Sequence, residues 1–240
     1  MRTIILTGAT GGLGSVLAQK IMERSLGELI CIYRNEKKFQ KIFADQSSAM
    51  HPYKTSAEDD YKRLESMLAA IPTDEVVLIL NAFSIAPIQL IGDYTCHDID
   101  QMVSGNIRQN VVLLNEVIRI CHRGAYQLRI INLDSGAADF PLRGWGNYCA
   151  SKAYMNAFLS VVSLENQDYK VVSFDPGVMD TGMQKQIRET EKHVFDQVDQ
   201  FISYKEEKQL VSPSVVAEQL IERYISDWKA SKAREKRSLL

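Results

Sequence analysis

Residues 7–14 read TGATGGLG and follow the short apolar run TIIL at residues 3–6. The run has the length and β-branched character of a strand, and helix-spaced apolar residues follow the glycines from Gly14 to Arg24. Glycines at such a junction allow a tight exit from the strand, close approach of the backbone to a ligand and close helix packing. Free N–H groups at the start of the helix favour a phosphate. The stretch therefore predicts a pyrophosphate site at the end of the first strand.

The same alternation of strand and helix continues along the chain. Further strands are predicted at residues 28–33, 75–80, 128–133 and 170–174, with a weaker one at 52–55. Helices are predicted at residues 14–24, 35–44, 59–70, 98–123 and 148–164. Apolar strands joined by helices are typical of a parallel sheet covered on both faces. The sequence thus predicts a doubly wound α/β fold of the Rossmann type, formed by residues 1–240 as one domain.

Composition and charge exclude several other classes of function. The chain has 240 residues, a net charge of −2 and four scattered cysteines, Cys31, Cys96, Cys121 and Cys149. The balanced charge gives no reason to expect a nucleic-acid partner, and no apolar run reaches the roughly 18 to 20 residues of a membrane span. The cysteine and histidine spacing predicts no metal site, and unpaired cysteines favour the cytoplasm. The basic tail, residues 229–237, reads as a solvated or frayed helix end.

Arg34 comes directly after the second predicted strand, with Lys37 and Lys38 close behind. In a dinucleotide fold an acidic residue at this position binds the ribose 2′-hydroxyl, whereas an arginine suits a 2′-phosphate. The sequence therefore favours NADP(H) over NAD. The alternative is a solvent-facing arginine in a charged turn.

The stretch WGNYCASK at residues 145–152 places Tyr148 and Lys152 four positions apart. Alone, the pair is equally well explained as a helix with two polar residues on one side. It gains weight from Asn106 in a long predicted helix, from Ser135 just past a strand, and from DPGVMDT at 175–181. Together with the glycine stretch, this set resembles the short-chain dehydrogenase/reductase family over residues 3 to about 181.

The resemblance implies a catalytic role for each of these side chains. Tyr148 would donate the proton to a carbonyl oxygen that receives hydride, and Lys152 would favour the phenolate and bind the nicotinamide ribose. Ser135 would donate a hydrogen bond to the same oxygen, and Asn106 would hold a water in the proton relay. For Asn106 the alternative is a polar helix residue satisfied locally. The implied cofactor contacts are Thr7, Gly8, Thr10, Gly11, Gly12, Leu13, Gly14, Arg34, Asn81, Ala82, Tyr148, Lys152, Pro176, Gly177, Val178 and Thr181.

Two places depart from the family pattern. Residues 80–83 read LNAF where the family has N-N-A-G, so Phe83 is predicted to crowd the backbone on the adenosine side. The adenine-contacting aspartate after the third strand has no clear match among Ser56, Ala57, Glu58 and Asp59.

Three segments resemble the family branch that holds sepiapterin reductases and bacterial benzil reductases. They are residues 148–165, 175–190 and 212–220. This branch implies reduction of one carbonyl of a vicinal dicarbonyl. Trp145, Met179 and Met183 are candidate apolar walls of the substrate pocket, although each is also explained as core.

The sequence therefore predicts an NADPH-dependent carbonyl reductase acting on a ketone or vicinal dicarbonyl. A cofactor-binding sensing protein without turnover and an NAD-dependent secondary-alcohol dehydrogenase are the alternatives. The polar, helix-prone segment at about 183–210 is predicted to be a substrate lid. The apolar stripes of residues 98–123 and 148–164 predict a homodimer or homotetramer.

Overall fold

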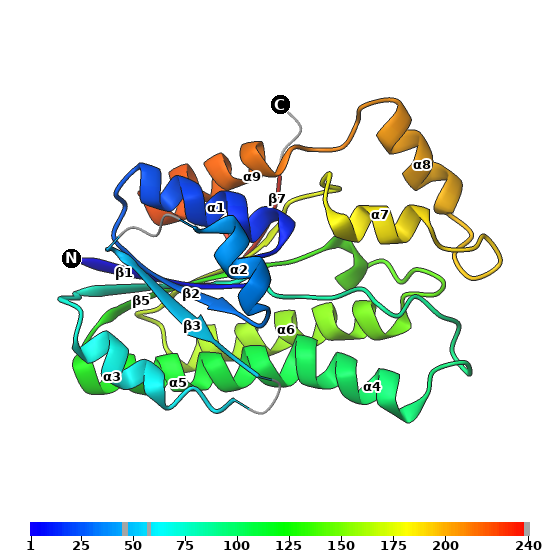
Figure 1. Ribbon diagram of the computed structural model, residues 1–240. Helices are drawn as coiled ribbons and strands as arrows, with labels where there is room; N and C mark the ends of the chain where they lie inside the picture. Colours follow the sequence, from blue (N-terminus) through cyan, green and yellow to red (C-terminus); the bar gives the residue numbers. More distant parts are fainter. Residues whose placement is uncertain (45–47, 57–58, 238–240) are drawn as a thin grey trace.

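The computed structural model describes residues 1–44, 48–56 and 59–237, and its centre is a seven-stranded sheet between two layers of helices (Figure 1). The strands are β1 (Arg2–Thr7), β2 (Glu28–Tyr33), β3 (Met50–Lys54), β4 (Glu75–Leu80), β5 (Gln127–Leu133), β6 (Lys170–Asp175) and β7 (Arg234–Lys236). Their order is β3-β2-β1-β4-β5-β6-β7, and every neighbouring pair is parallel. The predicted doubly wound fold is confirmed, and the chain reverses its direction across the sheet between β1 and β4.

The central strands β1, β2 and β4 are mostly apolar because both faces of the sheet are covered there. In β1, Ile4 and Leu6 pack into the cluster on one face, whereas Ile5 packs into the cluster on the other. Successive side chains of a strand point to opposite faces, so a run without polar residues requires helices on both sides. The predicted bounds of β2 and β4 match the structure.

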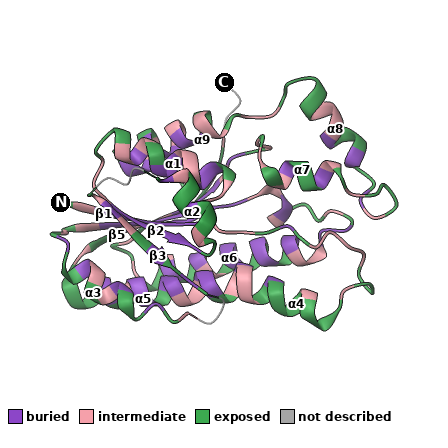
Figure 2. Ribbon diagram, viewed as in Figure 1, coloured by how far each residue is buried: buried purple, intermediate pink, exposed green. Residues whose placement is uncertain are grey.

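The helices divide between these two faces. On one side lie α1 (Gly12–Glu23), α2 (Glu36–Ile42) and α9 (Pro213–Leu220); on the other lie α3 (Arg63–Ala69), α5 (Gln109–Gly124) and α6 (Gly146–Glu165). In Figure 2 the strands and the inner sides of α5 and α6 are coloured as buried, and the outer sides of the helices are coloured as exposed. Each helix thus buries one stripe against the sheet.

The helix predicted over residues 98–123 consists of three parts. Helix α4 (Cys96–Met102) continues into a π-helical turn, Val103–Arg108, and then into α5. Within this turn, the Asn106 carbonyl accepts a hydrogen bond from Asn110 Nδ2 at 2.9 Å. A π-helical turn adds a residue to the helix, which a search for 3.6-residue periodicity does not detect.

The prediction for the basic tail is wrong, because part of it forms β7 beside β6. The strand carries charged rather than apolar residues, so no hydrophobic pattern marks it. Glu235 is buried and accepts hydrogen bonds from Tyr224 Oη at 2.5 Å and Arg223 Nη2 at 2.6 Å. β7 is one edge of the sheet, and β3, which contains Pro52, is the other.

Candidate active site

A cleft of about 1210 Å³ is lined by segments that directly follow five of the strands, β1, β2, β4, β5 and β6. The carboxyl ends of parallel strands are where open α/β sheets bind ligands. Among the predicted site residues, the structure brings the following to the cleft: Thr7, Gly8, Thr10, Gly11, Gly12, Leu13, Arg34, Asn81, Ala82, Asn106, Ser135, Tyr148, Lys152, Pro176, Gly177, Val178 and Thr181. Gly14 lies outside the lining.

The glycine loop leaves β1 through Gly8, whose φ of +66° is in the left-handed region. The Gly11 N–H donates to the Gly8 carbonyl at 2.8 Å and closes the turn. A Cβ on Gly14 would lie 2.2 Å from the Gly8 oxygen, so only glycine lets α1 start this close to the strand. Gly11, Gly12 and Leu13, at the start of α1, line the cleft, and a glycine loop leading into a helix N-terminus fits the pyrophosphate of a dinucleotide.

Gly12 has a further neighbour, since a Cβ there would lie 2.9 Å from Cγ2 of Thr181. The segment after β6 thus packs directly against the glycine loop. Gly177 has a φ of +73°, and its N–H donates to Asp175 Oδ1 at 3.0 Å. This tight turn after Pro176 brings Val178 to Thr181 over the cleft.

Thr7, Asn81 and Ala82 form the joint between β1 and β4. Thr7 Oγ1 accepts hydrogen bonds from the Asn81 N–H at 2.8 Å and the Ala82 N–H at 2.9 Å. Asn81 Nδ2 donates to the Thr7 carbonyl at 3.0 Å. These polar groups bond to one another, so in this structure they brace the loop that borders the cleft.

Ser135 and Tyr148 both line the cleft. Ser135 follows β5, and Tyr148 lies in the first turn of α6 with 6% of its surface exposed. Burial raises the pKa of the Tyr148 phenol, the hydrogen bond with Ser135 lowers it, and the charges of Asp134 and Asp175 raise it. The net shift is upward, so the phenol keeps its proton at neutral pH, and a nearby positive charge would make it a stronger acid.

Lys152 is 2% exposed and lies one helical turn beyond Tyr148. Its Nζ donates to the Leu133 carbonyl at 2.5 Å and lies 3.2 Å from the centroid of the Phe83 ring. Burial lowers the pKa of Lys152 to about 7, although the charges of Asp134 and Asp175 oppose that change. The Phe83 ring, which is predicted to crowd the adenosine side, lines the cleft and lies against the Lys152 amine.

Asn106 is 1% exposed and its side chain is fully engaged. Its Oδ1 accepts from the Ser84 N–H and its Nδ2 donates to the Ser84 carbonyl, both at 2.8 Å. The amide therefore pins the segment after β4 to the π-helical turn. These bonds match the alternative given for Asn106, a polar helix residue whose side chain is hydrogen-bonded within the protein.

At the adenosine end, the exposed Arg34 crosses the cleft toward α5. Its Nη2 donates to Gln109 Oε1 at 2.6 Å, and Gln109 Nε2 donates to the Ser56 carbonyl at 2.5 Å. Sequence reasoning missed Gln109, although a polar side chain three residues after Asn106, in an apolar helix stripe, was a usable signal. Lys38 also lines the cleft.

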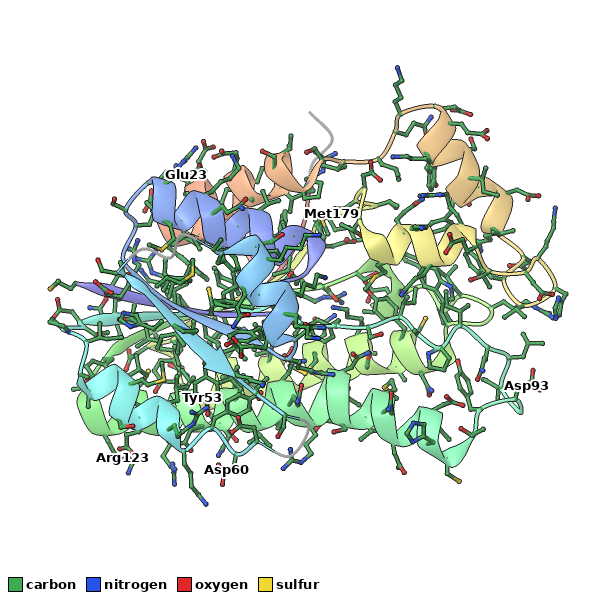
Figure 3. All side chains as sticks on the ribbon, viewed as in Figure 1. Glu23, Tyr53, Asp60, Asp93, Arg123 and Met179 are labelled. Atoms are coloured by element: carbon green, nitrogen blue, oxygen red, sulfur yellow. The ribbon has the colours of Figure 1, made fainter. Side chains whose placement is uncertain are left out.

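The segment after β3, where the adenine-contacting aspartate of the family has no clear match, is only partly described. Ala57 and Glu58 lie outside the described residues. Asp59 Oδ1 accepts hydrogen bonds from the Tyr61 N–H at 2.7 Å and from Tyr53 Oη at 3.2 Å, so this carboxylate orders the chain locally. Tyr53 is labelled on β3 in Figure 3.

Trp145 and Phe201 line the cleft together with residues of α7 (Gly182–Arg188), and Phe201 lies on α8 (Val198–Glu206). Trp145 stacks on Phe195 with ring centroids 5.0 Å apart, and Phe201 meets Trp145 edge-on at 5.6 Å. Met179, labelled on the segment that leads into α7 in Figure 3, lines the cleft together with Met183. Sequence reasoning missed Phe195 and Phe201, which lie far from Trp145 in the chain.

Within the described part of the chain, no helix combines the length and apolar character needed to cross a membrane. No three histidine, cysteine or acidic side chains among the described residues come together as metal ligands would.

Comparisons with known proteins agree with this geometry. A family model described as short chain dehydrogenase matches residues 2–192. A benzil reductase ((S)-benzoin forming) of Bacillus cereus is 36% identical over 228 residues, which cover 90% of this chain and 91% of that protein. A sepiapterin reductase of Bos taurus is 27% identical over 204 residues, which cover 78% of this chain and 76% of that protein.

Solved structures share the fold. The KRED1-Pglu enzyme superimposes with a TM-score of 0.83 at 23% identity and covers 94% of this chain and 96% of its own. The closed form of serine dehydrogenase complexed with NADP⁺ has a TM-score of 0.76 at 19% identity, covering 98% of this chain and 94% of its own.

Proposed function

This chain belongs to the short-chain dehydrogenase family, and from that premise we propose that it is an NADPH-dependent reductase of ketones or vicinal dicarbonyls. The observation that carries the proposal is the placement of Ser135, Tyr148 and the buried Lys152 together in the lining of a cleft that also contains the glycine loop. The similarity to benzil and sepiapterin reductases supports the dicarbonyl class.

The roles of the side chains follow from their chemistry. NADPH, when bound, supplies the hydride. Tyr148 gives its proton to the carbonyl oxygen, and Ser135 donates a hydrogen bond to the same oxygen as negative charge develops on it. Lys152 in its protonated form places a positive charge near the phenol and favours the phenolate after transfer. Asn106 holds the segment after β4 in place through its hydrogen bonds with Ser84, and its role in the proton relay stays a prediction.

The direct test is NADPH oxidation measured against a panel of benzil, a dicarbonyl pterin, a quinone and a simple aryl ketone. We expect the highest kcat/KM for the vicinal dicarbonyls. Absence of turnover in both directions, with NADPH still bound, would favour the alternative of a sensing protein. Faster oxidation of secondary alcohols with NAD than reduction with NADPH would favour the alcohol dehydrogenase.

Arg34 is proposed to bind the 2′-phosphate of NADPH, with Lys38 nearby on the same rim. Arg34→Asp should raise the KM for NADPH by roughly ten- to a hundredfold, because it removes a charge-assisted hydrogen bond and adds repulsion. The KM for NADH should change much less. Lys37→Asp is the matched control, since it makes the same charge change outside the cleft lining. Equal losses with both cofactors would remove the proposed role of Arg34.

Residues 1–240 form one domain in this proposal, with residues 183–210 as its substrate lid. The segment contributes Phe195 and Phe201 to the aromatic cluster around Trp145. Its outer side is held by ion pairs at the surface, such as Lys205 with Asp180 at 2.6 Å. Exposed ion pairs contribute little stability, so the burial of these aromatic rings is what mainly holds the proposed lid closed over a substrate.

We propose a homodimer, or a homotetramer that contains it, because α6 exposes an apolar stripe. Val161 is 49% exposed, Leu164 is 75% exposed and Tyr154 is 42% exposed on the side of α6 away from the sheet. A two-fold axis would bury the same stripe from both copies. A cytoplasmic location is also proposed, since all four cysteines are free.

Val161→Glu should convert the oligomer into a monomer at micromolar concentration, as measured by light scattering, because it places two like charges in the self-complementary interface. Val215→Glu on α9 is the matched control, since Val215 is 46% exposed on the other face of the sheet. It should leave the mass unchanged. A monomeric wild-type protein would contradict the proposed assembly.

A further inference from the structure

Arg234, on the C-terminal strand β7, contacts two carboxylates that lie on either side of Ser135 in the chain. Its Nη2 donates to Asp134 Oδ2 at 3.0 Å and to Asp139 Oδ2 at 2.8 Å. Its Nη1 donates to Asp139 Oδ1 at 2.8 Å, so the contact with Asp139 is bidentate. One guanidinium therefore joins the two ends of the short segment that carries the Ser135 hydroxyl.

The contact with Asp134 is buried. The Asp134 side chain is 3% exposed, and Asn156 Nδ2 donates to its two oxygens at 3.0 and 2.9 Å. Asn156 lies on α6 one helical turn beyond Lys152, so Asp134 connects β5, α6 and β7. A buried carboxylate needs a compensating charge, and Arg234 is the cation that supplies it.

We propose that Arg234 is a positioning residue that holds the Ser135 hydroxyl against Tyr148 by clamping Asp134 and Asp139. The inference rests on the proposed function, in which Ser135 assists proton transfer from Tyr148. The Ser135 segment is a single short turn, and its Oγ also accepts a hydrogen bond from the Ala137 N–H at 3.2 Å. With both ends fixed, the turn has little freedom to move the hydroxyl away from the phenol.

The same strand has a second anchor that does not touch the Ser135 segment. Glu235 accepts hydrogen bonds from Tyr224, Arg223 and the Ser231 N–H. Successive strand residues point to opposite faces of the sheet, so Glu235 fixes β7 from the side away from Asp134. Glu235→Gln therefore weakens the attachment of the strand without removing the clamp, and it is the matched control.

The test compares kcat, the Kd of NADPH and the melting temperature of the variants. Arg234→Gln should lower kcat by roughly tenfold, because it loosens the placement of one catalytic group, and should leave the Kd of NADPH within about twofold. Glu235→Gln should lower the melting temperature but keep kcat. If the two variants lose kcat in proportion to their melting temperatures, β7 is only structural and the clamp is refuted.

A double-mutant cycle with Ser135→Ala separates the clamp from other effects of Arg234. If Arg234 acts through Ser135, then Arg234→Gln should cause no further loss of kcat in the Ser135→Ala protein. A full tenfold loss in that background would overturn the clamp while leaving the proposed function intact. A normal kcat for Ser135→Ala alone would instead remove the proposed role of Ser135, and the clamp with it.

Asp139→Asn covers the case in which Arg234→Gln fails to fold. The Asp139 side chain is 38% exposed, so this change keeps the buried pair of Asp134 and Arg234 and weakens only the second arm of the clamp. We expect a roughly threefold lower kcat that disappears in the Ser135→Ala background. An unchanged kcat would show that the arm to Asp139 positions nothing.

Discussion

Tyr148→Phe should lower kcat for carbonyl reduction by roughly two to four orders of magnitude, because it removes the proton donor and keeps the ring. The ring packs edge-on against Trp145 with centroids 5.9 Å apart, and phenylalanine preserves that contact. The Kd of NADPH, measured by fluorescence quenching, should therefore stay within about twofold.

The matched control for this change is Tyr154→Phe, which removes a hydroxyl from an exposed position on the same helix. It should leave kcat unchanged. Near-normal ketone reduction by Tyr148→Phe would mean that the Tyr148–Lys152 pair is only two polar residues on one helix, and another group would have to donate the proton.

Lys152→Met should lower kcat/KM by roughly two to three orders of magnitude and should also weaken NADPH binding. Lys152 is proposed both to favour the Tyr148 phenolate and to bind the nicotinamide ribose. Methionine is unbranched and apolar, so it can fill the space beside Phe83 without leaving a large cavity. The variant loses the ammonium and the donor to the Leu133 carbonyl. A fall in kcat with unchanged NADPH binding would contradict the proposed contact with the ribose.

The pH dependence provides a second measurement on Lys152. Burial lowers its pKa to about 7, so the free enzyme loses the ammonium as the pH rises through that value. The kcat/KM of the wild-type protein should therefore fall as the pH rises through about 7. The kcat/KM of Lys152→Met should not show this fall near pH 7. A wild-type profile that stays flat to pH 9 would show that the ammonium is retained or is not required.

The fold was predictable because its strands are buried on both faces. An apolar run such as residues 75–80 has few alternatives to a central parallel strand. The spacing of Tyr148 and Lys152 likewise fixed their placement on one face of α6, since residues four apart are neighbours on a helix. These features depend on local pattern, which a single sequence contains.

What the sequence did not reveal depends on long-range pairing. β7 is held by charges whose partners, Asp134 and Tyr224, lie elsewhere in the chain, so its own three residues carry no strand signal. The contact between Phe83 and Lys152 was not predictable for a similar reason, because the two residues lie far apart in the chain. Gln109 gains its meaning only when α5 brings it beside Arg34.

The two edges of the sheet bear on how the protein behaves at high concentration. A sheet grows by adding a strand to a regular row of free N–H and C=O groups. β3 carries Pro52, which has no N–H to offer, and β7 is three residues long and fully charged. Edge-to-edge stacking into fibrous aggregates is therefore disfavoured at both ends of the sheet, and concentrated solutions of the folded protein should resist that route.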